Sequence, residues 1–123
     1  MEKVIAVIVT YNRIKLLKEC LTAVLSPPSK LHKIVLIDNA STDGTADLFI
    51  KGGEYDKDVI DYCRMETNLG GAGGFYEGIK ICRDMECDYV WIMDDDTIPY
   101  TDCLEELMSA RSKIEGKIGY LAS

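Results

Sequence analysis

Short apolar runs of strand length, separated by segments with helical spacing, are the feature that most constrains this chain. Four such runs, rich in β-branched or aromatic residues, occur at residues 4–10, 34–37, 59–65 and 89–93. Apolar residues between them recur at intervals of three or four, as in helices that cover a sheet. Strands that alternate with helices form right-handed crossover units in a parallel sheet. The sequence therefore predicts an α/β fold with a mostly parallel sheet flanked by helices.

The helices are predicted from their apolar faces and stop signals. A first helix should end near Leu25, shortly before two consecutive prolines. A second should begin at the glycine-rich segment 68–74 and bury a face that includes Phe75, Ile79 and Cys82.

The chain is expected to form one domain over residues 1–123, because domains commonly run to about 100–200 residues. Apolar residues make up 47% of the chain, which is enough for a buried core. Towards the C-terminus, Asp102 followed by Glu105 resembles a helix-capping box, and the apolar run 118–121 is predicted to start a fifth strand.

The charge balance restricts the partners. The chain has 14 Lys and Arg against 21 Asp and Glu, a net charge of −7. Such a chain repels a phosphate backbone, so nucleic acid is not an expected partner. A smaller phosphate ligand would be repelled in the same way, and its binding would need a local feature of the site that offsets the negative charge. No apolar run approaches the ~20 residues of a membrane span, so no transmembrane segment is predicted.

The cysteines and the N-terminus indicate a reducing compartment. The five cysteines are odd in number, none of their spacings is CxxC, and the chain enters its first strand without a signal peptide. We therefore expect free thiols and a location in the cytoplasm or at the inner face of the membrane. His32 is the only histidine, which disfavours a zinc site.

Three adjacent aspartates, Asp94, Asp95 and Asp96, directly follow the last of the four apolar runs. Adjacent carboxylates repel one another by on the order of 1 kcal/mol each at surface dielectric. A hard divalent cation would relieve this repulsion, and carboxylate oxygens suit Mg²⁺ or Mn²⁺. The triplet therefore suggests a metal site that carries an anionic diphosphate; the alternative is a solvated acidic turn.

The glycine-rich segment 68–74 fits neither the GxGxxG pattern nor a P-loop. Its glycines would let a ligand approach the backbone closely, near the free amides at a helix N-terminus. A tight turn or close helix packing explains the same glycines equally well.

The remaining candidates stand where the earlier strands end, and in parallel sheets ligands bind beyond these carboxyl ends. Asp38, with Asn39 beside it, is suited to accept a hydrogen bond from a ring N–H or a ribose hydroxyl, or else to form an Asx turn or helix cap. Tyr11 is a candidate for stacking on a base and Arg13 for a phosphate contact, although a solvent-facing turn accounts for both. Arg64 is a second candidate phosphate contact or a strand-surface charge.

Four segments together resemble the nucleotide-binding half of the GT-A glycosyltransferases of glycosyltransferase family 2. They are VTYNR (9–13), DNASTDGT (38–45), NLGGAGGF (68–75) and DDD (94–96), in the order and spacing of that family. The glycine-rich form with three aspartates is most similar to the galactofuranosyl- and rhamnosyltransferases that build bacterial surface polysaccharide. The resemblance implies a GT-A, Rossmann-like fold that stops after the half containing the DxD motif.

The resemblance also implies roles for individual residues. Asp94 and Asp96 would form the DxD pair that binds Mn²⁺ or Mg²⁺. Thr10 and Tyr11 would line the base pocket, and Asp38 would read uracil or thymine. The residues expected to contact the donor are Thr10, Tyr11, Asn12, Arg13, Asp38, Asn39, Asn68, Gly70, Gly71, Gly74, Asp94 and Asp95.

The implied function is to bind a UDP- or dTDP-sugar through the metal, for inverting transfer of the sugar to a glycan or lipid-linked acceptor. The chain ends soon after Asp96, before the part in which such enzymes carry the acceptor site and general base. No catalytic residue is therefore assigned to it, and we expect a truncated enzyme that transfers sugar poorly and self-associates through an open sheet edge. The alternatives are a non-catalytic nucleotide- or protein-binding fragment, or a DxD phosphohydrolase with Asp94 as nucleophile.

Overall fold

The structure is a computed structural model that describes residues 2–27, 30–50 and 52–113. The run 118–121, predicted as a fifth strand, lies outside these residues. No helix within the described ranges is both long and apolar enough to cross a membrane.

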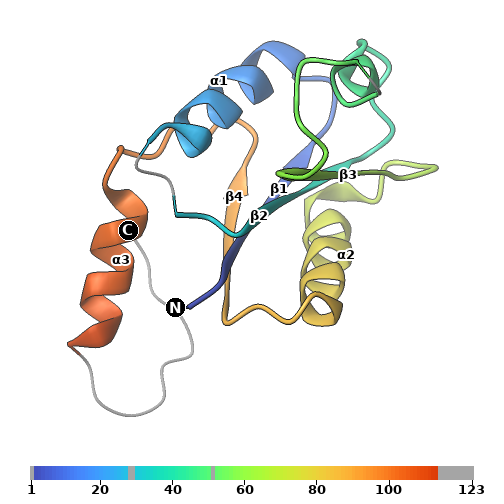
Figure 1. Cartoon of the computed structure of the whole chain (residues 1–123). Coiled ribbons are helices and arrows are strands. Elements are labelled where there is room, and N and C mark those ends of the chain that lie inside the picture. The colour runs from blue at the N-terminus through green and yellow to red at the C-terminus, as the bar shows by residue number, and fades with distance from the viewer. Residues whose placement is uncertain (1, 28–29, 51, 114–123) are drawn as a thin grey trace.

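A sheet of four parallel strands lies at the centre of the fold and confirms the predicted α/β architecture (Figure 1). Its spatial order is β3-β2-β1-β4, so β1 pairs with both β2 and β4. The strands are β1 (Val4–Thr10), β2 (Lys33–Asp38), β3 (Ile60–Arg64) and β4 (Tyr89–Asp94). Each coincides with a predicted apolar run, with ends that differ by at most one residue.

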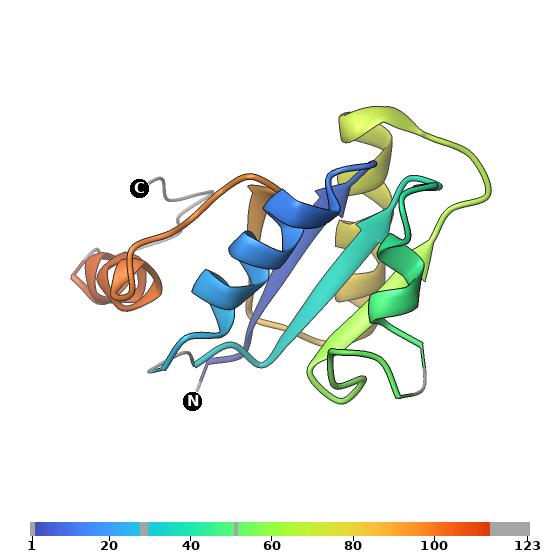
Figure 2. The ribbon, with the colours of Figure 1, turned by 90° about the horizontal axis from the view of Figure 1, so that it is seen from above.

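Helices cover both faces of the sheet. α1 (Ile14–Leu25) lies on one face and α2 (Gly70–Asp84) on the other, as the view from above shows (Figure 2). A 3₁₀ turn, η1 (Thr45–Leu48), follows β2, and α3 (Cys103–Ser112) lies to the side of β4.

The core follows the alternation of side chains along β1. Ala6 and Ile8 are fully buried on the face that packs against α1, whereas Ile5 and Val7 are fully buried on the face that packs against α2. A strand buried on both faces has to be apolar throughout, which is why β1 is a continuous apolar run in the sequence.

Glycines, rather than large apolar residues, bring α2 onto the sheet. An added Cβ at Gly74 would lie 2.7 Å from Cγ1 of Val9, and one at Gly78 would collide with Val7. Ile79, which the helical spacing predicted to be buried, is 44% exposed. The prediction for this helix face is therefore wrong at Ile79, because the helix turns its small residues to the sheet.

α3 packs more loosely than the other helices. Asp102 stands at its N-cap, but within the described part of the chain its side chain accepts no capping hydrogen bond, so the predicted capping box does not form. None of the residues of α3 itself is fully buried. A cavity of about 470 Å³ separates α3 from α1 and the start of the sheet, lined in part by Val24, Trp91, Leu104 and Met108.

Candidate nucleotide-binding site

The register of the sheet brings the predicted polar segments to one edge. Thr10 at the end of β1 is opposite Asp38 of β2, and Asp38 is in turn opposite Arg64 of β3. On the other side of β1, Val9 is opposite Asp94 at the end of β4. The expectation that these segments share one sheet edge is confirmed.

The turns after β1 and β2 are bonded directly to each other. The Asn12 amide donates to Oγ of Ser41 at 2.9 Å, and Oδ1 of Asn12 accepts from the Thr42 amide at 2.7 Å. Oδ2 of Asp43 accepts from the amide of Ile14 at 3.0 Å and so satisfies a free donor at the N-terminus of α1. Asn12 has a left-handed backbone, with φ of 49°, which asparagine tolerates better than most residues. The two turns therefore form a single wall of the site.

Asp38 lies at this edge as predicted but faces inward, with no exposed surface. Its Oδ1 accepts a hydrogen bond from the Ser41 amide at 2.9 Å, and its Oδ2 accepts one from the Tyr62 hydroxyl. Tyr62 is in turn stacked on Phe49, with 4.7 Å between ring centroids. In this conformation Asp38 orders the turn, as the Asx-turn alternative requires, and its contact with a base stays a prediction.

Asn39 also faces inward and connects the β2 turn to the start of α2. Its Nδ2 donates to the carbonyl of Gly70 at 3.1 Å, and its Oδ1 accepts from the Leu69 amide at 3.3 Å. Gly74, predicted to border the ligand, is buried against Asn39 and β1. Gly74 thus packs closely against the sheet, as the helix-packing alternative describes, and its contact with a ligand stays a prediction.

Other predicted residues form an exposed rim around this edge. Tyr11 is 46% exposed, and Arg64, Asn68, Gly70 and Gly71 are exposed as well. Gly70 has a left-handed φ of 74°, and its amide donates a 2.8 Å hydrogen bond to Oδ1 of Asn68. An added Cβ at Gly70 or Gly71 would meet no atom within 4 Å, so space is open beside this stretch of backbone.

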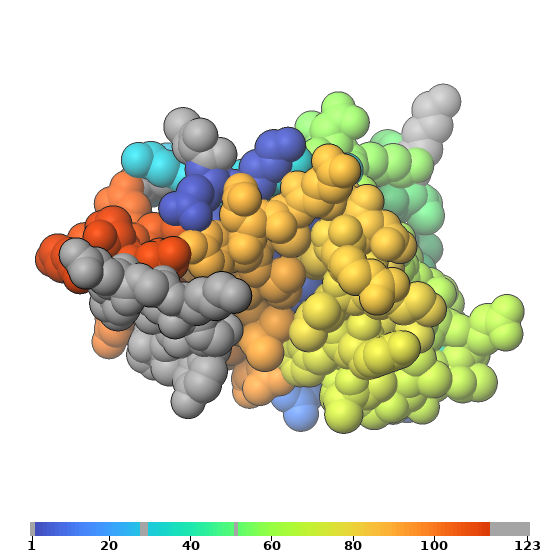
Figure 3. All heavy atoms as spheres, turned by 90° about the horizontal axis from the view of Figure 1, so that it is seen from below, coloured from blue at the N-terminus to red at the C-terminus, as the bar shows by residue number. Residues whose placement is uncertain are grey.

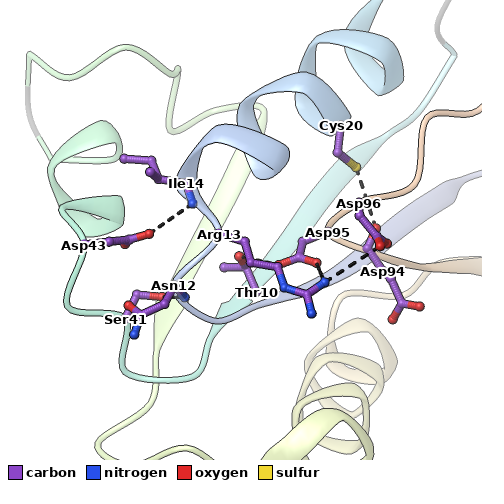
Figure 4. A network of polar contacts seen from close by, with 10 residues as sticks. All are labelled: Thr10, Asn12, Arg13, Ile14, Cys20, Ser41, Asp43, Asp94, Asp95 and Asp96. Carbon is purple, nitrogen blue, oxygen red and sulfur yellow. Dashed lines mark hydrogen bonds and ion pairs between the residues drawn. The ribbon is translucent and has the colours of Figure 1, made fainter.

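The three aspartates after β4 point in different directions (Figure 4). Asp95 is buried, and its Oδ2 accepts a hydrogen bond from Oγ1 of Thr10 at 2.9 Å. The guanidinium of Arg13 lies between the carboxylates of Asp95 and Asp96, with its Nη1 3.4 Å from Oδ1 of Asp95 and 3.7 Å from Oδ2 of Asp96. Asp94 extends away from Arg13 into solvent. The predicted contact of Asp95 with a donor is thus replaced, in this conformation, by contacts within the protein.

Two further residues contribute to the site without a sequence signal. Sγ of Cys20 lies 3.9 Å from the carbonyl oxygen of Asp94, beneath the triplet. Burial, and secondly the charges of Asp95 and Asp96, raise the pKa of Cys20 to about 12, so it stays a thiol. The second of these residues is Tyr62. It lies opposite Leu36 in the pairing of β3 with β2, and this position brings its hydroxyl to Asp38.

The donor set can be tested against the implied cation. Carboxylate oxygens are the ligands that Mg²⁺ and Mn²⁺ prefer, and the carboxylates of Asp94 and Asp96 are both exposed. Among the described residues there is no group of three His, Cys, Asp or Glu side chains that could hold a metal by itself. The residues therefore fit a cation that takes its remaining ligands from a bound diphosphate and water, and they do not form a closed protein cage.

Comparison with known proteins gives relatives that share this fold. The chain is 35% identical over 109 residues to galactofuranosyltransferase GlfT1 of Mycolicibacterium smegmatis, an alignment that covers 88% of this chain and 35% of the relative. The chain thus spans about a third of the length of that relative.

Solved structures show the same likeness. A mannosyltransferase from Pyrobaculum calidifontis, PcManGT in complex with GDP-Man and Mn²⁺, superposes with a TM-score of 0.69 at 27% identity, over 87% of this chain and 31% of that one. Staphylococcus aureus TarS (residues 1–349), in complex with UDP-GlcNAc, superposes with a TM-score of 0.72 at 21% identity, over 98% of this chain and 37% of that one. The latter likeness concerns the fold alone.

The sequence model of the family "Glycosyl transferase family 2" matches residues 5–115 of this chain. The matched range includes all four polar segments at the sheet edge. With this match, and with a relative of 35% identity that aligns over most of the chain, the protein belongs to glycosyl transferase family 2.

Proposed function

We propose that this chain is the donor-binding part of a glycosyltransferase of polysaccharide biosynthesis. It binds a nucleoside diphosphate sugar, UDP- or dTDP-linked, together with Mn²⁺ or Mg²⁺. The donor serves inverting transfer to a glycan or lipid-linked acceptor. The observation that carries the proposal is the gathering of four family segments at the carboxyl end of the sheet, among them two exposed carboxylates and an open stretch of glycine backbone.

Each part of the exposed rim suits one part of the donor. The ring of Tyr11 offers a surface on which a base can stack. Arg13 and Arg64 supply positive charge for phosphate oxygens in a protein of net charge −7. Gly70 and Gly71 leave room for a diphosphate or sugar to approach the backbone at the start of α2.

Asp94 and Asp96 would hold the cation. When bound, the cation supplies positive charge that stabilises the diphosphate as it leaves. The mannosyltransferase neighbour in complex with GDP-Man and Mn²⁺ supports a divalent metal in this fold. The protein's own part is to keep both carboxylates exposed at the end of β4, with that of Asp96 3.7 Å from Nη1 of Arg13.

Calorimetric titration with UDP, dTDP and GDP, each with Mn²⁺ and with EDTA, tests this proposal. We expect a pyrimidine diphosphate to bind only when Mn²⁺ is present. Asp96→Ala should weaken this binding by more than about tenfold, because it removes a ligand of the charge that offsets the diphosphate.

Asp58→Ala is a matched control, since Asp58 is exposed and lies in the loop before β3. This variant should bind as the wild type does. Equal affinity with Mn²⁺ and with EDTA would contradict the metal role, and tighter binding of GDP would contradict the pyrimidine preference.

Of the two alternative functions, one has no support and the other remains a candidate. The family match leaves no support for a DxD phosphohydrolase, since the acidic triplet follows β4 in a family 2 fold. Binding without transfer is the second candidate, because no residue of the described part of the chain is assigned a catalytic role. Release of UDP from a UDP-sugar, measured beside the calorimetry, separates the two: binding without release identifies a binding fragment.

A further inference from the structure

The middle carboxylate of the acidic triplet is built into the protein. Asp95 is 4% exposed, whereas Asp94 and Asp96 on either side are exposed. β4 ends at Asp94, and Asp95 and Asp96 lie in the turn that follows it, which the Thr97 amide closes by donating to the Asp94 carbonyl at 3.1 Å. In this turn the Asp95 side chain faces inward, and both of its neighbours lie at the surface.

Among the described residues, the Asp95 side chain is hydrogen-bonded to the turn between β1 and α1. Oδ2 accepts from the Thr10 hydroxyl at 2.9 Å, Oδ1 lies 3.4 Å from Nη1 of Arg13, and the amide of Tyr11 donates to the same carboxylate. A buried carboxylate needs such donors, because it has lost its hydration shell. Asp95 therefore fixes the turn that carries Tyr11 and Arg13.

Arg13 extends this arrangement to the rim. The same Nη1 that faces Asp95 lies 3.7 Å from Oδ2 of Asp96. Without Asp95, the exposed Asp96 would be the one remaining ion-pair partner of this guanidinium among the described residues.

We propose that Asp95 is a positioning residue for donor binding. It anchors Thr10 and Arg13, and it contacts neither the donor nor the cation. The proposal rests on the proposed function, and it assigns to Asp95 a part different from that of the two carboxylates beside it.

The test compares Asp95→Asn with Asp96→Asn, which are matched changes at adjacent positions. UDP affinity is measured by calorimetry with Mn²⁺ and with Mg²⁺, at equal concentrations, and Mn²⁺ affinity is measured by electron paramagnetic resonance in the absence of nucleotide. Asp95→Asn should weaken UDP by roughly fivefold with either metal, as expected for loss of a charge-assisted hydrogen bond that acts through other residues, and should leave Mn²⁺ affinity within about twofold. Asp96→Asn should weaken Mn²⁺ itself by more than about tenfold.

A loss of Mn²⁺ affinity in Asp95→Asn as large as in Asp96→Asn would overturn the proposal, because Asp95 would then be a metal ligand. Unchanged UDP binding in Asp95→Asn would overturn it as well. If Asp95→Asn does not fold, Thr10→Val removes the same hydrogen bond from the other partner while keeping the side-chain shape. Thr10→Val should then weaken UDP and spare Mn²⁺; unchanged UDP binding or a loss of Mn²⁺ affinity in this variant would count against the anchor.

Failure of the proposed function would be visible separately. If the wild type binds no nucleoside diphosphate, the anchor is still measured by thermal unfolding of Arg13→Gln, Asp95→Asn and the double variant. If the double variant loses less stability than the sum of the losses of the two single variants, the anchor is supported. Strictly additive losses overturn it.

Discussion

Buried polar side chains at the sheet edge are satisfied by donors from neighbouring strands, and Asp38 is the clearest case. It has no exposed surface, and its two oxygens accept from the Ser41 amide and the Tyr62 hydroxyl. Burial, and secondly the hydrogen bond and charge of Asp38, raise the pKa of Tyr62, which therefore remains a donor throughout the physiological range. The turn after β2 thus depends on a tyrosine of β3, which two strands, β2 and β1, separate from β4 and the acidic triplet.

Tyr62→Phe tests this dependence. The variant keeps the ring that stacks on Phe49 but leaves Oδ2 of the buried Asp38 without its donor. We predict a loss of about 1–3 kcal/mol in the free energy of unfolding, measured with denaturant. Tyr76→Phe is the control, because Tyr76 is exposed on α2. Equal stability of the two variants would mean that the Tyr62 hydroxyl does not support Asp38.

Asp43 shows the effect of pH at the same scale. Burial alone would raise its pKa, but hydrogen bonds from the Thr45 hydroxyl and from the amides of Ile14 and Thr45 outweigh burial and hold the pKa below 3.8. A carboxyl whose pKa is lowered by folding stabilises the protein above its unfolded pKa of about 3.9, and this stabilisation is lost as the pH falls through the folded pKa.

The predicted consequence concerns Asp43→Asn. The wild type should be more stable than this variant at pH 7, and the difference in unfolding free energy should shrink as the pH falls below about 4. Denaturant unfolding over this pH range measures it, with Asp58→Asn as the control for general acid effects. A difference that stays constant down to the lowest pH would contradict the assigned pKa direction.

At the scale of elements, the close approach of α2 to β1 depends on Gly74 and Gly78. Their missing side chains leave room for Val9 and Val7, so the helix axis lies nearer to the sheet than larger residues would allow. Because α2 begins at the glycine rim, this packing also sets where Gly70 and Gly71 lie relative to the strand ends.

Gly78→Ala and Gly71→Ala form a matched pair within this helix. An added methyl at Gly78 collides with Val7, and we predict a loss of about 1–3 kcal/mol in unfolding free energy from overpacking. At Gly71 the methyl meets no atom within 4 Å, so the change should be neutral or should stabilise the helix by up to about 1 kcal/mol. Thermal unfolding of both variants provides the comparison, and a loss of similar size at the two positions would argue against the packing role of Gly78.

At the scale of the whole molecule, β4 is one of the two edge strands of the sheet in the described part of the chain, since it pairs with β1 alone. Seen from the face that α2 covers, residues of β4 reach the surface beside that helix (Figure 3). Ile92 in this strand is 53% exposed. An open strand edge with an exposed apolar residue favours pairing with another copy.

We therefore predict self-association that increases with protein concentration, measured by sedimentation velocity. Ile92→Lys should shift the protein towards the monomer, because a charge on an edge strand opposes pairing. Ile50→Lys is the control: Ile50 is 56% exposed but lies beyond η1, away from β4. A wild type that stays monomeric at every concentration would contradict the prediction, as would equal effects of the two variants.

The sheet could be predicted from the sequence because apolar runs report burial directly. The run at Val4–Thr10 matches β1 at both ends, and the polar residue that follows each strand falls at the expected edge. The direction of polar side chains could not be predicted in the same way. Asp38 and Asp95 face inward because of Tyr62 and Thr10, which lie far from them in the sequence and carry no local signal. The face of α2 was misjudged at Ile79 for a related reason, since hydrophobicity does not identify a glycine as a contact residue.

The bonding between the turns after β1 and β2 has a practical consequence for changing which ligand is recognised. Hydrogen bonds of Asn12 with Ser41 and Thr42, and of Ile14 with Asp43, cross from one turn to the other. A chimaera that imports only residues 10–14 from a relative keeps the amide donors at positions 12 and 14, but without an asparagine at position 12 it leaves the Thr42 amide without its side-chain acceptor. Residues 10–14 and 38–45 should therefore be exchanged together, as one cassette.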